Sequence, residues 1–383
     1  MNEKHLHIIS FDVPYPADYG GIIDIFYKIR TLWKMGVNIH LHCFIYGNRK
    51  PQSELNRYCS EVNYYKRKTG FLSFLSFVPY IIKSRISHEL ENRLLQDDYP
   101  VLCEGIHTCG ILNNPALRGR EILFRPSNVE HEYYIGLAAL EKNIFKKAFF
   151  LTEALKLRCW EKNLLQVPVF FPVSEHDLLS FKSRFPGKEM SLLYSFHPFE
   201  EVDILKGMGD YVLFHGNLSV PDNLRVSLFL LEKVAPEIDM PLVIAGKDAP
   251  RILKKKAYVL PNVRLLENPD GEEMERLIRE AHIHLLLTYQ KAGLKLKLLL
   301  ALFRGRHIIV NSDMLTIPGL EQCVWIADDA ETMIKVIRKL RNKSFREKEI
   351  TGRKKCLPPL LFNEEKGRLL LKKTHPHNAY LKL

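Results

Sequence analysis

The sequence lacks several features that would place it quickly in a class of proteins. Its seven cysteines are odd in number and include no Cys-x-x-Cys pair, which argues against a disulfide framework and against a cysteine zinc site. No uncharged apolar run approaches the length of a bilayer span, and the first residues do not form an apolar segment followed by a small-residue cleavage site. These absences predict a cytoplasmic protein in a reducing compartment.

The chain also lacks the Gly-x-Gly-x-x-Gly fingerprint of a bound dinucleotide, and acidic residues are in the minority. Lys and Arg exceed Asp and Glu by 56 to 44, an excess spread along the chain rather than gathered in one tail. This distribution predicts local sites for anionic ligands and no nucleic-acid partner. With 383 residues, the chain is long enough for two domains with separate cores.

Short apolar segments alternate with segments of helical periodicity in both halves of the chain. Strands are expected at 5–11, 37–45, 101–104, 122–124 and 167–172, and then again at 211–215, 242–245, 263–266 and 281–287. The alternation predicts an α/β protein with two Rossmann-like, doubly wound domains facing across a cleft. A segment rich in Pro, Gly and acidic residues near 185–209 separates them. We expect domains at 1–200 and 201–357, with a helix within 358–383 returning to the first.

A phosphate site is expected where the strand at 281–287 leads into the next helix. The loop closes with Gly293, and Lys295 and Lys297 follow in the first helical turn. A helix N-terminus offers free N–H groups and a partial positive charge, so anions gather there. The alternative is a solvated lysine pair with nothing bound. Further glycines and asparagines end neighbouring strands, among them Gly216 and Asn268, and predict ligand-sized loops along one edge of the sheet.

Polar residues mark the same edge of the first domain. Gly20 and Gly21 allow a tight turn that brings backbone close to a ligand, unless they serve the turn alone. His107 follows the strand at 101–104. In the segment RPSNVEHEYY, capping of the next helix would explain Ser127 or Asn128. It explains Arg125, Glu130 and His131 less well, and a guanidinium, a carboxylate and an imidazole at a helix start predict a polar site.

Two other features favour ordinary explanations. Histidines two residues apart, at 5 and 7, 40 and 42, and 282 and 284, share one face of a strand, but no obvious further metal ligands accompany them. We expect strand histidines and no metal. The aromatic segment 71–86 ends in Lys83 and Arg85, and it fits either core packing or a helix at a membrane interface.

Four segments resemble glycosyltransferases of the group 1, family four type. FHGNLSVPDN and LVIAGKDAP are similar to the first two strands and loops of that family's nucleotide-binding domain. GLKLKLLLALFRGRHIIVNS resembles its donor-site segment, and RPSNVEHEYYIGLAALE an Arg-x-x-Asn-x-Glu-x-x-Tyr segment of some acceptor domains. The resemblance covers nearly the whole chain. It implies the GT-B architecture and a retaining transferase that needs a nucleotide diphosphate sugar as co-substrate but no cofactor or metal.

The resemblance also implies roles for individual residues. Those for the donor are Gly20, Gly21, Gly216, Asn217, Lys247, Asn268, Gly293 and Lys295. Those for catalysis are His107, Glu130, His131 and Lys297, and those for the acceptor are Arg125 and Asn128. Two departures accompany these matches: Leu300 stands where the family carries an acidic residue for the nucleotide ribose, and the loop after Gly216 lacks the usual Arg and Lys.

Together these features predict sugar transfer to a hydroxyl group of a glycan or lipid-linked acceptor in cell-envelope polysaccharide or glycoconjugate synthesis. The basic character and segment 71–86 suggest peripheral contact with the inner face of the membrane. Two rival hypotheses stay open. Leu300 and the missing bases favour a catalytically silent GT-B partner in a glycan-assembly complex, and a nucleotide-sugar epimerase would use the same architecture.

Overall fold

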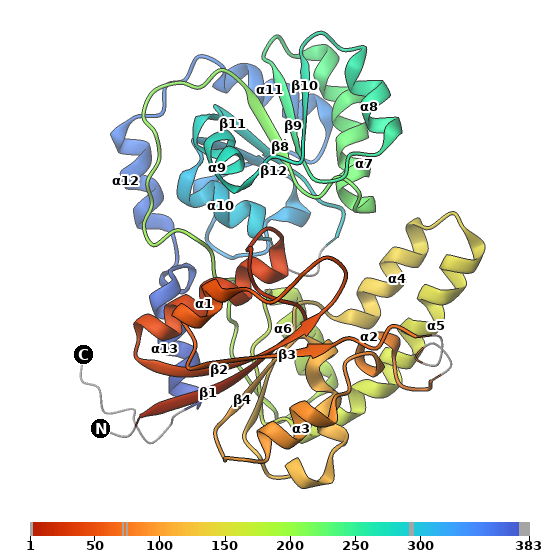
Figure 1. The fold of residues 1–383 in the computed structure, drawn as a ribbon. Coiled ribbons are helices and arrows are strands. Elements are labelled where there is room, and N and C mark those ends of the chain that lie inside the picture. The colour runs from red at the N-terminus through yellow and green to blue at the C-terminus, as the bar shows by residue number, and fades with distance from the viewer. Residues whose placement is uncertain (1–2, 71–72, 74–75, 291–294, 375–383) are drawn as a thin grey trace. The chain divides into compact units, whose positions relative to one another are not determined.

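The computed structural model describes residues 3–70, 73, 76–290 and 295–374, so Gly293 of the expected phosphate loop lies outside the described residues. The chain divides into two compact units (Figure 1). The first contains the described residues up to Pro198 and from Leu360 onward. The second contains the described residues between Phe199 and Pro359.

The first unit is built on a parallel sheet with the strand order β3-β2-β1-β4-β5-β6-β7. Its strands are β1 (Lys4–Ser10), β2 (Val37–Ile45), β3 (Glu61–Lys66), β4 (Val101–Glu104), β5 (Ile122–Arg125), β6 (Val169–Phe170) and β7 (Glu189–Met190). Its α-helices are α1 (Gly20–Lys34), α2 (Tyr80–Lys83), α3 (His88–Leu94), α4 (Glu130–Leu140), α5 (Ile144–Trp160), α6 (Glu175–Arg184) and α13 (Asn363–Thr374). The order reverses between β1 and β4, which makes that position the topological switch point of the sheet.

The second unit repeats this plan with the order β10-β9-β8-β11-β12-β13 and a switch point between β8 and β11. Its strands are β8 (Val212–His215), β9 (Leu242–Gly246), β10 (Val263–Glu267), β11 (Ile283–Leu286), β12 (His307–Val310) and β13 (Trp325–Ile326). Its α-helices are α7 (Pro221–Phe229), α8 (Arg251–Tyr258), α9 (Gly271–Glu280), α10 (Leu296–Arg304), α11 (Ala330–Leu340) and α12 (Glu347–Cys356).

Both sheets are parallel throughout and have helices on their faces, as the alternation predicted. Strands such as β8, β11 and β12 are buried along their whole length. A strand covered on both faces needs an uninterrupted apolar run rather than an alternating one, which explains why these strands were visible in the sequence.

The C-terminal helix α13 returns to the first unit and packs on α1, as expected. A side chain at Gly367 would meet the Met35 sulfur at 2.5 Å, so a larger residue there would require Met35 to move. Lys366, fully buried on the same helix, donates from its Nζ to the Ser195 carbonyl at 2.5 Å.

Several local predictions need correction. In the described part of segment 71–86 only Tyr80–Lys83 is α-helical, and the expected linker near 185–209 contributes strand β7. Helix α8 was not predicted. Asp222 or Asn223 could cap helix α7 on sequence grounds, but α7 follows Val220 without a side-chain cap, so neither residue has that role. One disulfide joins Cys323 to Cys356, a pair that the spacing did not indicate; the other five cysteines are free.

Candidate functional site

In the second unit, the residues expected to bind a donor gather at the carboxyl ends of the strands beside the switch point. The loop after β8 begins with Gly216 and Asn217, and the Asn217 carbonyl accepts a hydrogen bond from Asn223 at 2.9 Å. A side chain at Gly216 would lie 3.0 Å from the Asn223 amide, so glycine lets the loop fold onto α7. Ligands of open α/β sheets bind at such positions.

Lys297 joins this loop to the one after β11. Its Nζ donates to Asn223 Oδ1 at 3.0 Å and to the Leu287 carbonyl at 3.1 Å, and it lies 5.0 Å from the centroid of the Phe214 ring. Burial lowers the pKa of Lys297 to about 8. The ammonium is therefore still charged at pH 7 but poorly solvated, so an anion placed beside it gains an unusually strong interaction.

Other predicted donor residues lie around this centre. Lys295 is the residue before α10, is 8% exposed, and donates to the Gln290 carbonyl at 2.6 Å. The Lys247 carbonyl accepts from the Leu218 amide at 2.8 Å, which brings the loops after β9 and β8 together. Asn268 has a φ of 52° and accepts from the Asp248 amide at 3.0 Å, which links the loops after β10 and β9.

Asp222 anchors the loop after β11, a role that the sequence did not suggest. It accepts from the Thr288 hydroxyl at 2.8 Å and from the Tyr289 amide at 2.9 Å. The exposed Arg225, one turn further along α7, lies 3.8 Å from the centroid of the Tyr289 ring. This stacked pair supplies a guanidinium and an aromatic face at the edge where the family's usual Arg and Lys are missing.

In the first unit, His107 lies just past β4 at the other switch point. Gly105 turns the chain with a φ of +72°, and a side chain there would lie 2.8 Å from His107 Nδ1. That nitrogen has no hydrogen-bond partner in the described structure, and the ring packs against Phe11. Burial, with the charges of Arg85 and Arg67, lowers the pKa of His107 well below its usual value. The ring is neutral at pH 7, and its unpaired Nδ1 is buried against Gly105.

Glu130 begins helix α4 as a buried carboxyl group. Ser127 Oγ and Asn128 Nδ2 each donate to Glu130 Oε1 at 3.2 Å. Their position in the sequence suggested that one of them caps helix α4, but both bind the carboxylate instead and neither caps the helix. Burial raises the pKa of Glu130 to about 7, in spite of these two hydrogen bonds. A carboxyl group that is half ionised near pH 7 is suited to exchange a proton with a substrate.

Comparison with known proteins identifies a relative of this chain. An uncharacterized 44.6 kDa protein in the cps region of Klebsiella pneumoniae is 30% identical over 324 residues, which is 80% of this chain and 82% of that protein. The chain belongs to the family of this cps-region protein. No protein-family model matches this chain.

Solved structures show that this family member has the GT-B fold. S. aureus TarM, solved as a mutant with UDP, Fondaparinux and alpha-GlcNAc-glycerol, has a TM-score of 0.67 at 10% identity, with 97% of this chain and 100% of that chain covered. WaaG, a glycosyltransferase involved in lipopolysaccharide biosynthesis, has a TM-score of 0.62 at 13% identity, with 95% and 99% covered. A UDP-forming trehalose-phosphate synthase from Burkholderia xenovorans has a TM-score of 0.62 at 8% identity, with 97% and 100% covered.

Two predicted site residues of the GT-B chain take part in buried ion pairs. Arg125 is 1% exposed and donates to Asp24 Oδ2 at 3.2 Å and to the Phe171 carbonyl at 2.8 Å. His131 pairs through Nδ1 with Glu161 Oε1 at 2.7 Å, and Glu161 also pairs with Arg184. We therefore assign both side chains to the packing of the first unit rather than to a ligand.

The two glycines at the start of α1 have different surroundings. A side chain at Gly20 would meet no atom within 4 Å. One at Gly21 would lie 2.8 Å from the Phe11 ring, which in turn packs on His107. Gly21 therefore keeps Phe11, and through it His107, in place.

The strand histidines of the first unit form two hydrogen-bonded chains. Asp97 accepts from His7 Nε2 at 2.9 Å, His7 Nδ1 accepts from His42 Nε2 at 2.9 Å, and His42 Nδ1 accepts from the Tyr65 hydroxyl at 2.8 Å. In the second chain Glu61 accepts from His40 Nδ1 at 2.8 Å, and His40 Nε2 accepts from His5 at 3.0 Å.

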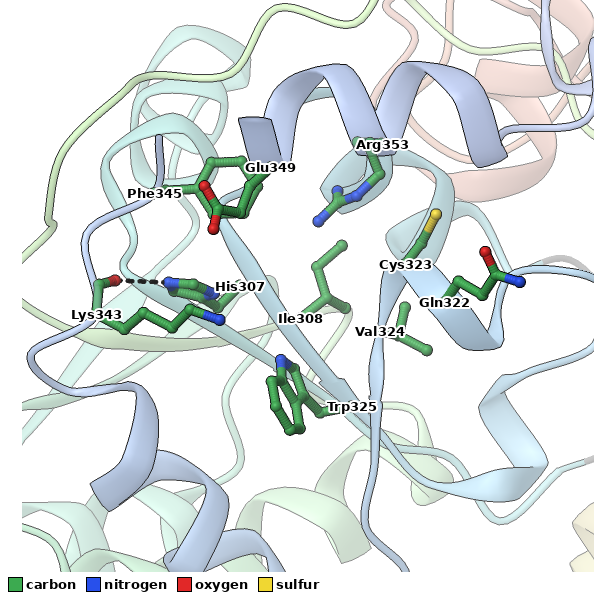
Figure 2. Close-up of a pocket in the computed structure, with 11 residues that line it drawn as sticks. His307, Ile308, Gln322, Cys323, Val324, Trp325, Lys343, Phe345, Glu349 and Arg353 are labelled. Carbon is green, nitrogen blue, oxygen red and sulfur yellow. Dashed lines mark hydrogen bonds between the residues drawn. The ribbon is translucent and has the colours of Figure 1, made fainter. Parts of the chain in front are cut away.

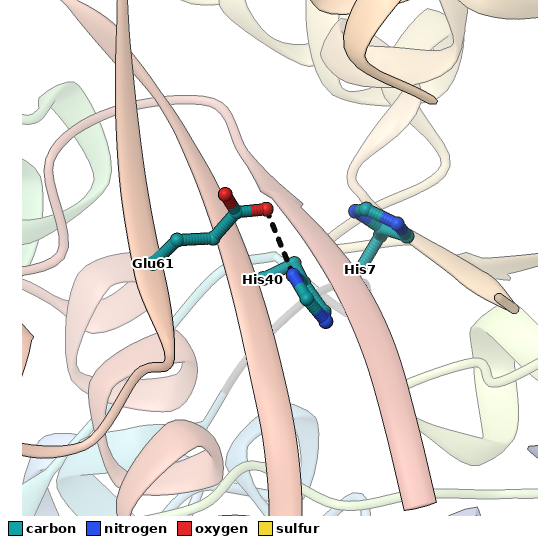
Figure 3. Close-up of side chains that lie close together, drawn as sticks. All are labelled: His7, His40 and Glu61. Atoms are coloured by element: carbon teal, nitrogen blue, oxygen red, sulfur yellow. Dashed lines mark hydrogen bonds and ion pairs between the residues drawn. The ribbon is translucent and has the colours of Figure 1, made fainter. Parts of the chain in front are cut away.

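His7, His40 and Glu61 lie close enough to suggest a metal site, with ligand atoms within 4.8 Å of one another (Figure 3). Both ring nitrogens of His7 and of His40 already have hydrogen-bond partners, however. We interpret the cluster as a hydrogen-bonded histidine ladder that satisfies buried polar atoms, because a metal would have to break these bonds.

The histidine ladder predicts loss of stability in acid. Burial lowers the pKa of His7 to about 4 and that of His42 to about 3, below the ordinary 6.5. Between each lowered pKa and 6.5 the unfolded chain binds a proton that the folded chain does not. The contribution of His7 and His42 to stability is therefore full above pH 6.5 and falls as pH decreases. Near pH 5.5, His42→Gln should reduce the pH slope of the unfolding free energy by about 1.4 kcal/mol per pH unit in urea denaturation. An unchanged slope would contradict the ladder.

A cavity of about 370 Å³ lies in the second unit, beside the amino ends of β12 and β13 (Figure 2). His307, Trp325 and Lys343 line it, and His307 Nε2 donates to the Lys343 carbonyl at 2.8 Å. None of the predicted site residues lines this cavity. Open parallel sheets bind ligands at the opposite, carboxyl edge.

Proposed function

We propose that the chain transfers a sugar from a nucleotide diphosphate sugar to a hydroxyl group of a glycan or lipid-linked acceptor. The observation that carries the proposal is Lys297, half-buried and charged at the switch point of the second sheet and hydrogen-bonded to Asn223 at the start of α7 and to the residue after β11. The relative in a cps region supports a role in cell-envelope polysaccharide or glycoconjugate synthesis.

The proposed chemistry depends on stabilising the leaving group. As the bond between the sugar and the diphosphate breaks, negative charge grows on the phosphate, and a new bond forms to the acceptor oxygen. Lys297 and Lys295 would bind that charge, with Lys247 and the N–H groups at the start of α10 nearby. We propose that these cations make a divalent metal unnecessary and that the anomeric configuration is retained. Unchanged rates in EDTA and NMR of the product would test these two points.

The first unit would bind the acceptor. His107, neutral and half-buried beside the switch point of the first sheet, would orient a sugar hydroxyl of the acceptor. Glu130 would accept the proton that the acceptor hydroxyl loses, since its pKa of about 7 lets it ionise at neutral pH. Asn128 would keep the carboxylate oriented.

Donor binding should weaken as pH rises through 8. A diphosphate would keep Lys297 protonated, whereas in the free protein its pKa is about 8. Each pH unit above 8 should therefore weaken the affinity for a nucleotide diphosphate sugar up to about tenfold, until Lys297 titrates in the complex as well. Calorimetric titration with a panel of UDP-, GDP- and other nucleotide sugars would measure this.

The matched variants are Lys297→Met and Lys335→Met. The first should bind the donor at least about tenfold more weakly, with a flat profile above pH 8, because the buried charge is gone. The second removes an exposed lysine on α11 and should behave like the parent. Equal donor affinity in both variants would remove Lys297 from the site.

A catalytically silent partner protein is the second candidate, and Leu300 favours it. This residue packs in the core beside Leu277 and cannot accept hydrogen bonds from a ribose. A chain that binds none of the nucleotide sugars would support this role. An epimerase is distinguished by change of the donor sugar without any acceptor.

A further inference from the structure

Helix α5 has an apolar face that the rest of the first unit does not cover. Its inner face is formed by Glu153, Ala154, Leu157 and Trp160, which are buried. On the opposite face Ile144, Leu151 and Leu155 are 72%, 43% and 69% exposed. Their spacing of seven and four residues, with Ala148 and Cys159 in the same series, places them on one side of the helix. Phe145, at the start of the helix, is 81% exposed.

The charges around this stripe are all of one sign. In the fully described stretch 142–166 the exposed ionic residues are Lys142, Lys146, Lys147, Arg158 and Lys162, and none is acidic. The two carboxylates of that stretch are buried. Glu153 accepts from the Tyr80 amide at 2.6 Å, and Glu161 accepts from His131.

Helix α5 is a better membrane candidate than the helix within segment 71–86. Ile81 and Ile82 of α2 are buried in the core of the first unit, so that helix serves packing. The contact between Tyr80 and Glu153 holds the segment against α5, and Phe77, three residues earlier, is 98% exposed. In the part of the chain that the structure describes, no helix combines the length and apolarity required to cross a bilayer.

We propose that the exposed face of α5 docks on an anionic membrane surface. Apolar side chains in line, with Lys147 and Arg158 beside them at helical spacing and no exposed carboxylate on α5, match an interface where acyl chains lie beneath acidic headgroups. A protein partner for the same face would need a matching acidic groove, and that alternative is an outcome of the test. The proposal goes beyond sugar transfer, because a chain that transfers no sugar would bind the membrane equally well.

The test is co-sedimentation of the full chain with vesicles of phosphatidylcholine alone and of phosphatidylcholine with 30% phosphatidylglycerol. The parent should bind the anionic vesicles and bind the neutral ones far more weakly. Lys147→Glu with Arg158→Glu should weaken binding at least about 20-fold, since each basic residue near an anionic surface contributes roughly fivefold. Leu151→Ser with Leu155→Ser should weaken it comparably, whereas Leu179→Ser, an exposed site on α6 of the same unit, should not.

A second measurement places the helix itself at the interface. Cys159 is free and exposed on the apolar stripe, so a polarity-sensitive fluorophore attached there should shift to shorter wavelength when anionic vesicles are added. Failure of the parent to bind, or equal binding by the α5 variants, would overturn the proposal. So would self-association of the parent that the α5 variants abolish without any vesicle binding, because that result assigns the face to a second copy of the chain.

Discussion

Glu130→Gln is expected to stabilise the protein by about 3 kcal/mol at pH 8 and to abolish sugar transfer. The folded-state pKa of about 7 lies well above the ordinary 4.5, because burial penalises the ionised form. The contribution of Glu130 to stability is therefore full below pH 4.5 and is lost as pH rises towards 7, by about 1.4 kcal/mol per pH unit. Glutamine stays neutral and keeps an oxygen to accept from Ser127 and Asn128, so it avoids this cost.

The measurement is urea denaturation at pH 8 and pH 4.5, together with nucleotide release from the donor that binds. The two proteins should have equal stability at pH 4.5. Glu132→Gln is the matched control on the same helix: its side chain is 37% exposed, and the change should alter stability by less than about 0.5 kcal/mol. A Glu130→Gln variant that is less stable than the parent at pH 8, or that transfers sugar normally, would contradict the proposed role.

Asp24→Ala should destabilise the first unit by about 3–5 kcal/mol, since it leaves buried cations without their counter-ion. Asp24 Oδ2 accepts from Lys28 at 3.3 Å and from Arg125 at 3.2 Å, and Oδ1 accepts from the Phe196 amide at 2.7 Å. Glu104, 2.6 Å from Lys28, would be the remaining carboxylate of the cluster.

Urea denaturation of three variants separates the contributions. Asp24→Asn keeps an acceptor for the Phe196 amide but removes the charge, so it should lose most of the same free energy. Asp239→Ala, whose exposed carboxylate pairs with Arg341, should change stability by less than about 1 kcal/mol. If Asp24→Ala also stays within that limit, Arg125 is free of its structural role and returns as an acceptor-binding candidate.

Most strands and the donor edge were predictable because their signals are local, whereas β3 and β7 were not predicted. Each strand covered on both faces is an apolar run, and parallel strands bring their carboxyl ends to one edge whatever the loops contain. Gly216, Asn217, Lys295 and Lys297 could therefore be assigned to one edge before their distances were known. The returning helix α13 was expected for a similar reason, since a helical segment follows the last strand of the second unit.

Residue roles that depend on distant partners were not predictable. Arg125 stands in a motif that suggests a ligand, but its partners come from residues 24 and 171. Arg225 lies on α7 and Tyr289 in the loop after β11, far apart in the sequence, and no local pattern indicates that they form a pair. The exposed stripe on α5 had the composition of a core helix, because sequence shows that a helix face is apolar but not what covers it.

The amino-acid sequence alone determined the class of fold, the two units and the edge of each sheet where polar loops gather, because these follow from hydrophobic periodicity and chain direction. Tertiary structure alone decided which charged groups form buried ion pairs and which have a shifted pKa. It also decided which apolar helix face stays exposed. Those properties depend on burial and on partners brought from distant parts of the chain. Glu130 and Arg125 stand five residues apart in one motif. Their surroundings differ: Glu130 has the raised pKa of the proposed proton acceptor, whereas Arg125 forms a buried ion pair with Asp24.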